Sequence, residues 1–279
     1  MKRISLASKS LALAILLAGC ADTSRLTDRG GYRVDTSVSS LNQNARVRYL
    51  VMHYTAVNDR RSLELLTRGA GSAHYLAPSV PRVVNGKPVV LRLVPEEKRA
   101  WHAGISEWNG RSNLNDTSVG IEIVNPGFTV EAGGRRWHPF SPNQIELVAL
   151  LAEDIIRRHQ ISPDNVVAHS DIAPLRKSDP GPLFPWEQLA GRGIGAWPDR
   201  PVVDKYLAGR APDAPVPVLN LQRALAKYGY SLPQHGGVDD ETTRVVSAFQ
   251  MHFRPGDISG RADAETEAIA MALLEKYRT

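Results

Sequence analysis

Cysteine is nearly absent from this chain of 279 residues, whose only thiol is that of Cys20. A body without further cysteines has no disulfide framework, and it lacks the thiolates of a closed, structural zinc site. An excess of one charge is also lacking, because 34 Lys and Arg oppose 29 Asp and Glu. Three of the basic residues (2, 3 and 9) lie in a leader that we expect to be removed, which leaves 31 minus 29, or +2. This surplus does not support a nucleic-acid partner.

No hydrophobic run of the sequence is long enough to span a bilayer. The apolar segment at residues 11–18 follows basic residues and has the length typical of an export signal. It ends in Leu17-Ala18-Gly19-Cys20, which resembles a bacterial lipobox, so we expect a signal peptide over residues 1–19 and a lipid anchor on Cys20. An ordinary secretory peptide is the alternative. Ala21 after the cysteine favours, by the same resemblance, the outer membrane, facing the periplasm, over the inner membrane.

The length predicts two domains, and 42% hydrophobic with 23% charged residues is typical of a globular protein. We expect a monomer. A polar stretch at residues 20–45 is predicted to be the anchor and tether, and a segment rich in Pro, Asp and Arg at 199–217 is predicted to be a linker. They delimit a first domain at 46–198 and a second at 218–279, where the apolar pattern predicts three short helices.

Helices and turns of the first domain follow from local signals. A capping-box pattern opens a helix at Ser141, with Pro142 at its first position. A shorter helix is predicted at residues 58–67, with Leu63 and Leu66 facing inward. Residues 127–139 form a turn-rich insertion.

Two predicted strands end in histidine. Residues 47–54 form a dense run of β-branched and aromatic residues with His53 near its end, and the apolar run 166–168 leads directly to His169. The Pro- and Gly-rich segment that follows continues neither strand nor helix, and it places Lys177 and Asp179 on an irregular loop. If the two strands are neighbours in one sheet, both imidazoles emerge at the same edge and Asp179 folds over them.

A third predicted strand carries a buried carboxylate. In residues 118–124, period two places Glu122 on the face opposite Val119, Ile121 and Ile123. A carboxylate buried there requires a cation, a metal-associated water or a proton. Gly120 beside it suggests room for a ligand. The alternative is a solvent-facing Glu122 on an edge strand.

Two histidines and one carboxylate are the donors of an open, hydrolytic zinc site. We therefore predict one Zn²⁺ per chain, bound by His53, His169 and Asp179. Glu122 is then the base that takes a proton from the attacking water, and Lys177 stabilises the oxyanion that forms on the attacked carbonyl.

These motifs resemble the amidase-2 family of zinc-dependent N-acetylmuramoyl-L-alanine amidases. The resemblance covers roughly residues 45–192 and rests on five motifs in order: Leu50 to Ala56, Ala100 to Gly104, Val119 to Glu122, Ala168 to Pro174 and Lys177 to Gly181. It implies a mixed central β-sheet flanked by helices. It also implies the metal ligands, the base and the lysine named above.

Residues 218–279 resemble a three-helix peptidoglycan-binding domain. The resemblance rests on Leu221-Gln222, Tyr228-Gly229-Tyr230, Gly237-Val238-Asp239 and Ala248-Phe249-Gln250. Lipobox, amidase and wall-binding module together resemble lipid-anchored envelope amidases. They imply hydrolysis of the amide between N-acetylmuramic acid, or its anhydro form, and L-alanine, with peptidoglycan and muropeptides as partners and a membrane contact through the anchor.

Several assignments stay open at this stage. Trp101 and His102 are candidates for substrate contact, whereas His74 fits either a hydrogen-bonded histidine of the sheet or a substrate contact. His159 at a helix end and Trp186 are predicted to be structural. The alternative function is a non-catalytic peptidoglycan receptor, and a zinc peptidase that cuts within the stem peptide shares the chemistry but not the order of the motifs.

Overall fold

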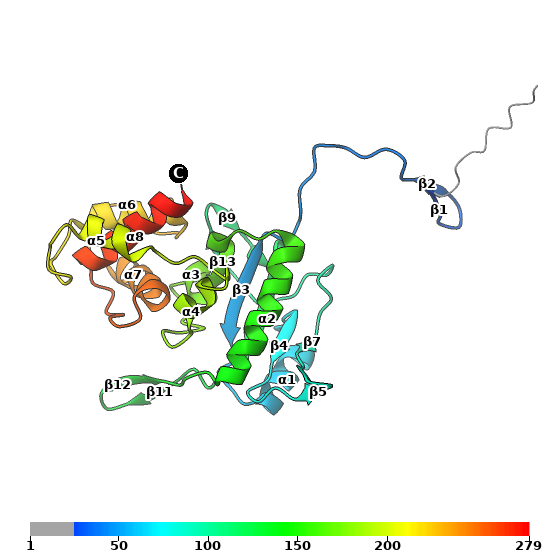
Figure 1. Cartoon of the computed structure of the whole chain (residues 1–279), viewed down its shortest axis with the longest axis horizontal. Coiled ribbons are helices and arrows are strands. Elements are labelled where there is room, and N and C mark those ends of the chain that lie inside the picture. Colours follow the sequence, from blue (N-terminus) through cyan, green and yellow to red (C-terminus); the bar gives the residue numbers. More distant parts are fainter. Residues whose placement is uncertain (1–24, 279) are drawn as a thin grey trace, which may run out of the picture. The chain divides into compact units, whose positions relative to one another are not determined.

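The computed structural model describes residues 25–278 and divides the chain after residue 44 (Figure 1). The first unit carries a small antiparallel hairpin of β1 (Leu26–Asp28) and β2 (Arg33–Asp35) where the sequence indicated an irregular tether. The predicted signal peptide and Cys20 lie outside the described residues. Between residues 25 and 278, no helix combines the length and apolar character needed to cross a bilayer.

A five-stranded mixed sheet forms the centre of the second unit. Its strand order is β13-β3-β10-β4-β7, with β13 (Val166–Ala168), β3 (Tyr49–Tyr54), β10 (Ser118–Ile123), β4 (Tyr75–Ala77) and β7 (Leu91–Arg92). The first four strands are parallel and β7 is antiparallel to β4. The predicted mixed sheet is confirmed, and β10 is an interior strand rather than an edge.

One face of the sheet packs against α2 (Pro142–His159). Ser141 caps this helix as predicted, because its Oγ accepts a hydrogen bond from the backbone N–H of Gln144 at 3.3 Å. The Gln144 amide in turn donates to the carbonyls of Pro78 and Val124, at 3.0 and 2.8 Å, and so ties the helix start to the sheet. The apolar side chains of this layer include Leu50, Met52, Val119, Ile121, Ile123, Val148, Ala152 and Ile155.

Some local predictions were wrong. In α1 (Asp59–Arg68) the buried residue is Ser62, and Leu63 is 42% exposed. This helix approaches the domain through a small side chain, so Leu63 lies outside the core. The turn-rich insertion forms a hairpin of β11 (Phe128–Glu131) and β12 (Gly134–Trp137), because its two halves pair antiparallel.

Two further short hairpins belong to loops of the first domain. They consist of β5 (Val83–Val84) with β6 (Lys87–Pro88), and of β8 (Glu107–Trp108) with β9 (Arg111–Ser112). After β13 the chain makes one helical turn, α3 (His169–Ile172), where the sequence predicted no helix. A second short helix, α4 (Trp186–Ala190), follows further along the chain.

Three helices form the predicted C-terminal domain: α6 (Val218–Tyr228), α7 (Asp240–Phe253) and α8 (Ala264–Tyr277). The stretch predicted as a linker contains another helix, α5 (Arg200–Leu207), whose Val203 is buried in the same core. This stretch therefore adds to the helical domain.

Two glutamines link the helices of this domain in the same way. The Gln222 side chain donates to Thr242 Oγ1 at 2.9 Å and accepts from the backbone N–H of Gly236 at 2.8 Å. Gln250 repeats this pattern one helix later, with Thr266 at 3.0 Å and Gly260 at 2.8 Å. Each buried amide thus has partners on the loop and helix that follow it, as a buried polar group requires.

The second face of the sheet and the helical domain share one apolar core. Val51 and Val167 of the sheet belong to it, together with Trp108 and the aromatic residues Tyr228, Tyr230, Phe249 and Phe253. A buried carboxylate crosses this boundary. Asp171 accepts hydrogen bonds from the Tyr230 hydroxyl at 2.6 Å, from His252 Nδ1 at 2.7 Å and from the backbone N–H of Ala168 at 2.7 Å. The helical domain therefore supports the turn that carries His169.

Candidate metal and catalytic site

Three predicted metal ligands converge at one edge of the sheet. His53 lies on β3, His169 begins α3 directly after the neighbouring strand β13, and Asp179 lies on the following loop. The Nδ1 atoms of the two histidines are 2.9 Å apart, and Asp179 Oδ2 is 3.1 Å from His53 Nδ1 and 2.9 Å from His169 Nδ1. All three side chains are buried. The three side chains therefore meet at one edge of the sheet, as the sequence predicted.

The outer nitrogens of both histidines determine where their protons lie. Ser118 Oγ donates to the Leu114 carbonyl at 2.6 Å, so it accepts from His102 Nε2 at 3.1 Å. His102 Nδ1 is then an acceptor for His53 Nε2, at 2.9 Å. His169 Nε2 donates to the Ala103 carbonyl at 3.1 Å. In both ligands the proton sits on Nε2, and a lone pair on Nδ1 points into the cluster.

The charge states of these groups also suit a cation. Burial, followed by the nearby His169, lowers the pKa of His53 to about 4, so its imidazole is neutral at physiological pH. Burial raises the pKa of Asp179, but the close approach of His169 and His53 outweighs burial and holds this pKa well below its ordinary value, so Asp179 is a carboxylate. Two lone pairs and one carboxylate oxygen therefore face each other in a buried space. This donor set fits a divalent metal ion, and it is the set that zinc uses in open sites.

Glu122 stands beside this cluster, directly opposite His53 in the parallel pairing of β10 with β3. Its Oε2 is buried and has no hydrogen-bond partner among the described residues. Burial, and then the charge of Asp179, raise the pKa of Glu122 well above its ordinary value, while Lys177 opposes this shift. A buried carboxyl with a free oxygen and a raised pKa is suited to accept and return a proton.

A cavity of about 420 Å³ opens onto these groups. Glu122, His169, Lys177 and Asp179 line it, together with Trp101 at its rim, which is 58% exposed. Tyr54 also lines the cavity, and its hydroxyl lies 3.0 Å from Ser178 Oγ, which ties the sheet to the loop that carries Lys177. The cavity thus brings the three candidate ligands, the Glu122 carboxyl and the Lys177 ammonium group to one surface.

Gly120 does not leave room for a ligand, as the sequence had suggested it would. A Cβ atom at this position would lie 2.5 Å from the His102 ring, so the missing side chain makes room for His102 rather than for a ligand. His102 is 8% exposed and uses both ring nitrogens within the protein. Its position makes it a support for His53. Substrate contact by His102 and Trp101 remains a prediction.

The other histidines that the sequence singled out have structural partners. His74 Nδ1 accepts from the backbone N–H of Gly120 at 3.0 Å, and its Nε2 lies 3.2 Å from the Lys98 carbonyl. His159 lies 2.6 Å from Glu96. Trp186, predicted to be structural, is 2% exposed.

Sequence reasoning missed three supporting residues. Ser118 fixes the proton on His102, Asp171 holds the turn at His169, and Arg176 donates to the Ala103 carbonyl at 2.6 Å, the acceptor that His169 also uses. Ser118 and Asp171 each lie within a motif that had been singled out. The sequence signal for Ser118 and Asp171 was a hydroxyl or a carboxylate next to a strand that carries a site residue. Their hydrogen-bond partners, however, are distant along the chain, so the sequence alone did not reveal their roles.

Two family models match the chain. Residues 43–182 match the N-acetylmuramoyl-L-alanine amidase family, and residues 216–269 match a peptidoglycan-binding domain. The chain is 54% identical over 267 residues to the N-acetylmuramoyl-L-alanine amidase AmiD of Escherichia coli, with 96% of each chain covered.

Solved structures show the same relationship. The fold matches AmiD from E. coli, in complex with the substrate anhydro-N-acetylmuramic acid-L-Ala-D-gamma-Glu-L-Lys, with a TM-score of 0.88 and 53% identity over 91% of this chain and 98% of that one. It matches AmpDh3 from Pseudomonas aeruginosa, in complex with anhydromuramic pentapeptide, with a TM-score of 0.78 and 44% identity over 90% and 98%.

The chain therefore belongs to the N-acetylmuramoyl-L-alanine amidase family. It is an enzyme of this family that also carries a peptidoglycan-binding domain. This finding sets aside the alternative of a non-catalytic receptor.

The hydrogen-bond chain behind His53 makes a first prediction. Ser118→Ala removes the acceptor that fixes the His102 proton, so His53 Nδ1 is no longer held as a bare lone pair. We expect the zinc dissociation constant, measured by competition with a chromogenic chelator, to rise about tenfold. Thr117→Ala is the matched control, because the neighbouring Thr117 hydroxyl is buried without a hydrogen-bond partner among the described residues. Equal zinc affinity of wild type and Ser118→Ala would contradict the proton assignment.

The raised pKa of Glu122 makes a second prediction, for the metal-free protein. Between the ordinary pKa of a glutamate and the raised pKa, the unfolded chain is ionised and the folded chain is protonated. Unfolding then releases a proton from Glu122. The free energy of unfolding of the wild type therefore falls as pH rises, by up to about 1.4 kcal/mol per pH unit. Glu122→Gln has no ionisable group at this position and lacks this pH dependence. We expect the variant's gain in free energy of unfolding, measured with urea in the presence of a chelator, to be larger at pH 7 than at pH 5.

The exposed variant Glu107→Gln serves as the control for this measurement, since it makes the same chemical change outside the site. A difference between Glu122→Gln and wild type that does not change with pH would show that Glu122 is ionised in the folded protein throughout this range.

Proposed function

We propose that this enzyme is a zinc-dependent, lipid-anchored amidase that hydrolyses the amide between N-acetylmuramic acid, or its anhydro form, and L-alanine in peptidoglycan and muropeptides. The observation that carries the proposal is the convergence of His53 Nδ1, His169 Nδ1 and Asp179 Oδ2 within 3.1 Å of one another, beside the free Glu122 carboxyl. Two histidines, an aspartate and a nearby glutamate are the residues of a metal-dependent hydrolase, and the family to which the chain belongs is named for hydrolysis of this amide.

The substrate class is inferred from the relatives. The AmiD structure contains an anhydromuramyl peptide described as its substrate, and the AmpDh3 structure contains an anhydromuramic pentapeptide. More than 90% of each of these chains aligns with this one. We therefore propose anhydromuramyl peptides as substrates here, and the same bond in intact muramyl peptides.

The residues of the cavity divide the work of hydrolysis. A zinc ion held by His53, His169 and Asp179 would polarise the carbonyl oxygen and lower the pKa of a water molecule toward about 7. Glu122 takes a proton from the attacking water as its oxygen bonds to the lactyl carbonyl carbon. As the carbon–nitrogen bond breaks, Glu122 returns the proton to the amine of L-alanine. The positive charge of Lys177 stabilises the negative charge that develops on the carbonyl oxygen.

Purified protein and muropeptides of defined structure test the reaction. We expect release of free stem peptide, loss of activity on chelation and its return with zinc. Glu122→Gln should lower kcat about 10²- to 10⁴-fold, because the proton transfer loses its acceptor, with Glu107→Gln unchanged. Mass analysis of the products distinguishes the alternatives, since only an amidase leaves muramic acid with a bare lactyl carboxylate. Cleavage within the peptide would identify a peptidase, and activity that survives chelation would contradict the zinc mechanism.

The proposed membrane contact rests on the lipobox at Leu17-Ala18-Gly19-Cys20. Three acyl chains on Cys20, at about 0.8 kcal/mol for each buried CH₂, anchor a protein stably to a membrane. The protein would then face the periplasm from the outer membrane. We expect the Cys20→Ala chain, expressed in a Gram-negative host, to leave the membrane fraction and to lack the acyl mass that intact-protein mass spectrometry finds on wild type. Equal membrane content for both chains would contradict the anchor.

A further inference from the structure

A second groove lies next to the catalytic cavity, on the surface where the two domains meet. It measures about 380 Å³, and its walls come from the loop 174–178, from α7 of the helical domain and from Arg135 on β12. Arg176, Lys177 and Ser178 line both this groove and the catalytic cavity. The two hollows therefore share one wall and lie next to each other.

The groove is basic throughout. Its lining includes four cationic side chains, Arg135, Arg176, Lys177 and Arg244, and no acidic one. Of these four, only Arg244 has a carboxylate within ion-pair distance in residues 25–278, namely Asp240 at 2.8 Å. Arg176 donates to two backbone carbonyls, which bear no net charge, and the Arg135 guanidinium lies 4.3 Å from the centre of the Phe128 ring. Most of this positive charge is therefore not neutralised within the protein.

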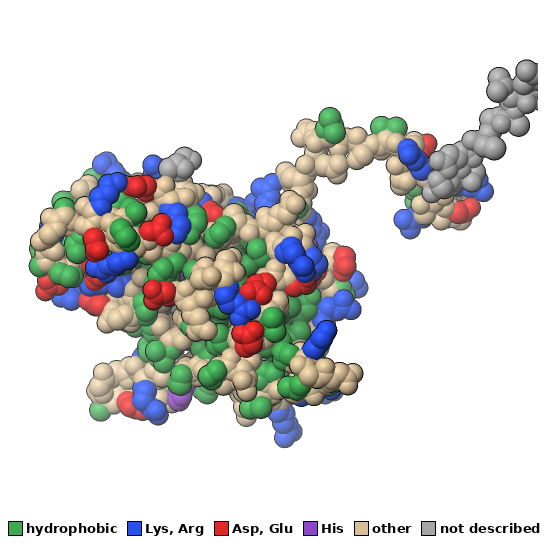
Figure 2. Space-filling model, viewed as in Figure 1, with side chains coloured by type: hydrophobic (Ala, Val, Ile, Leu, Met, Phe, Trp, Pro, Cys, Tyr) green, Lys and Arg blue, Asp and Glu red, His purple; other side chains and the backbone are tan. Residues whose placement is uncertain are grey.

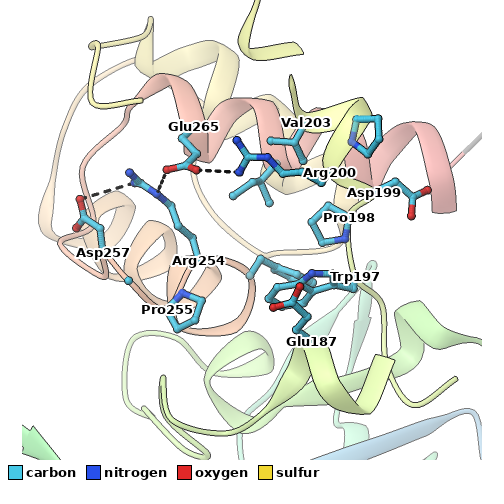
Figure 3. A pocket seen from close by; sticks show the side chains of 14 residues that line it. Glu187, Trp197, Pro198, Asp199, Arg200, Val203, Arg254, Pro255, Asp257 and Glu265 are labelled. Carbon is cyan, nitrogen blue, oxygen red and sulfur yellow. Dashed lines mark hydrogen bonds and ion pairs between the residues drawn. The ribbon is translucent and has the colours of Figure 1, made fainter. Parts of the chain in front are cut away.

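A larger hollow elsewhere in the described chain provides a contrast. This cavity of about 710 Å³ also contains arginines, but Figure 3 shows Arg254 bonded to Asp257 and Glu265, and Arg200 bonded to Glu265. Acidic and basic side chains are likewise interspersed over the face seen in Figure 2. The excess of positive charge in the interdomain groove is therefore a local feature, and it adjoins the active site.

We propose that this groove binds the carboxylate groups of the stem peptide, in the part of the substrate that follows L-alanine. The inference rests on the proposed amidase reaction. In the peptide of the AmiD complex, glutamate is linked through its γ-carboxyl, which leaves its α-carboxylate free, and the terminal lysine adds a second carboxylate. The leaving peptide thus carries two carboxylates, on the second and third residues after the bond that is cut, a reach of roughly 10 Å in an extended chain.

Arg244 connects the groove to the C-terminal helical domain. This arginine belongs to α7, within the match to the peptidoglycan-binding domain. The helical domain would then help to select the peptide at the catalytic site, in addition to any contact that it makes with the cell wall elsewhere. Ser247 and Thr243 of the same helix line the groove as well. Their hydroxyls donate to the carbonyls of Ile258 and Asp239, and their lone pairs can accept hydrogen bonds from the N–H groups of a peptide.

The test compares two substrates on four proteins. The substrates are anhydro-N-acetylmuramic acid-L-Ala-D-γ-Glu-L-Lys and the same compound with both carboxyl groups converted to amides. The proteins are wild type, Arg135→Gln, Arg244→Gln and the double variant. Lys177 and Arg176 are left intact, because one is assigned to the reaction and the other holds the acceptor of His169. Arg223→Gln, at an exposed position of α6 outside the groove, is the matched control.

With the acidic substrate, we expect KM to rise about threefold for each single variant and about tenfold for the double variant, with kcat within twofold of wild type. The amidated substrate should have a KM about tenfold above that of the acidic one on wild type, and the variants should not change it further. Arg223→Gln should match wild type with both substrates. Unchanged KM in the double variant would overturn the proposal, and so would an equal rise of KM for both substrates, which would indicate contact with a neutral part of the ligand such as the glycan.

Calorimetric titration of the free tripeptide L-Ala-D-γ-Glu-L-Lys separates this inference from the proposed function, because it requires no hydrolysis. Tighter binding to wild type than to the double variant supports the groove even if neither protein cuts the amide, in which case the proposed reaction is the part that fails. Equal binding to both proteins overturns the groove, whatever the activity.

Discussion

The parallel register of three strands is the constraint on which the site depends. β3 pairs with β10 so that Glu122 lies opposite His53, and β13 pairs with β3 so that Ala168 lies opposite Met52 and His169 follows at the same edge. A slip of one residue in either pairing would turn its side chains toward the face covered by α2. The apolar residues of β3 and β10 prevent this, because Leu50, Met52, Val119 and Ile121 are buried against that helix.

At this edge the protein places three hydrogen-bond acceptors against one another without a positive charge between them. The protons of both ligand histidines are held on the outer nitrogens, by His102 in one case and by the Ala103 carbonyl in the other. The inner lone pairs then face a buried carboxylate with no donor between them. Such an arrangement is costly to bury without a cation. The support is part of the fold, since the ring of His102 occupies the space that Gly120 leaves on the neighbouring strand.

The helical domain supports the same site from the second face of the sheet. Its aromatic residues share a core with the second face of the sheet, and Tyr230 and His252 complete the hydrogen bonds of Asp171, two residues after His169. Removing a donor from a buried carboxylate costs more than the hydrogen bond contributes, because the charge stays buried. The basic groove continues this relationship toward the surface. The amidase domain and the domain that matches a peptidoglycan-binding module thus form one packed unit.

The sequence by itself determined which side chains meet at this edge: the positions of His53, His169, Asp179 and Glu122 follow from strand patterns, strand ends and motif order. The capped helix at Ser141 follows from local hydrogen bonds. The sequence did not determine the exposure of Leu63, the hairpin at residues 127–139, the helix within the predicted linker, or the purpose of Gly120 and Asp171. These depend on partners that are distant along the chain, such as His102 for Gly120 and Tyr230 for Asp171. Periodicity reports which face of an element is apolar, whereas only the tertiary structure decides which distant residue fills the space or completes the hydrogen bond.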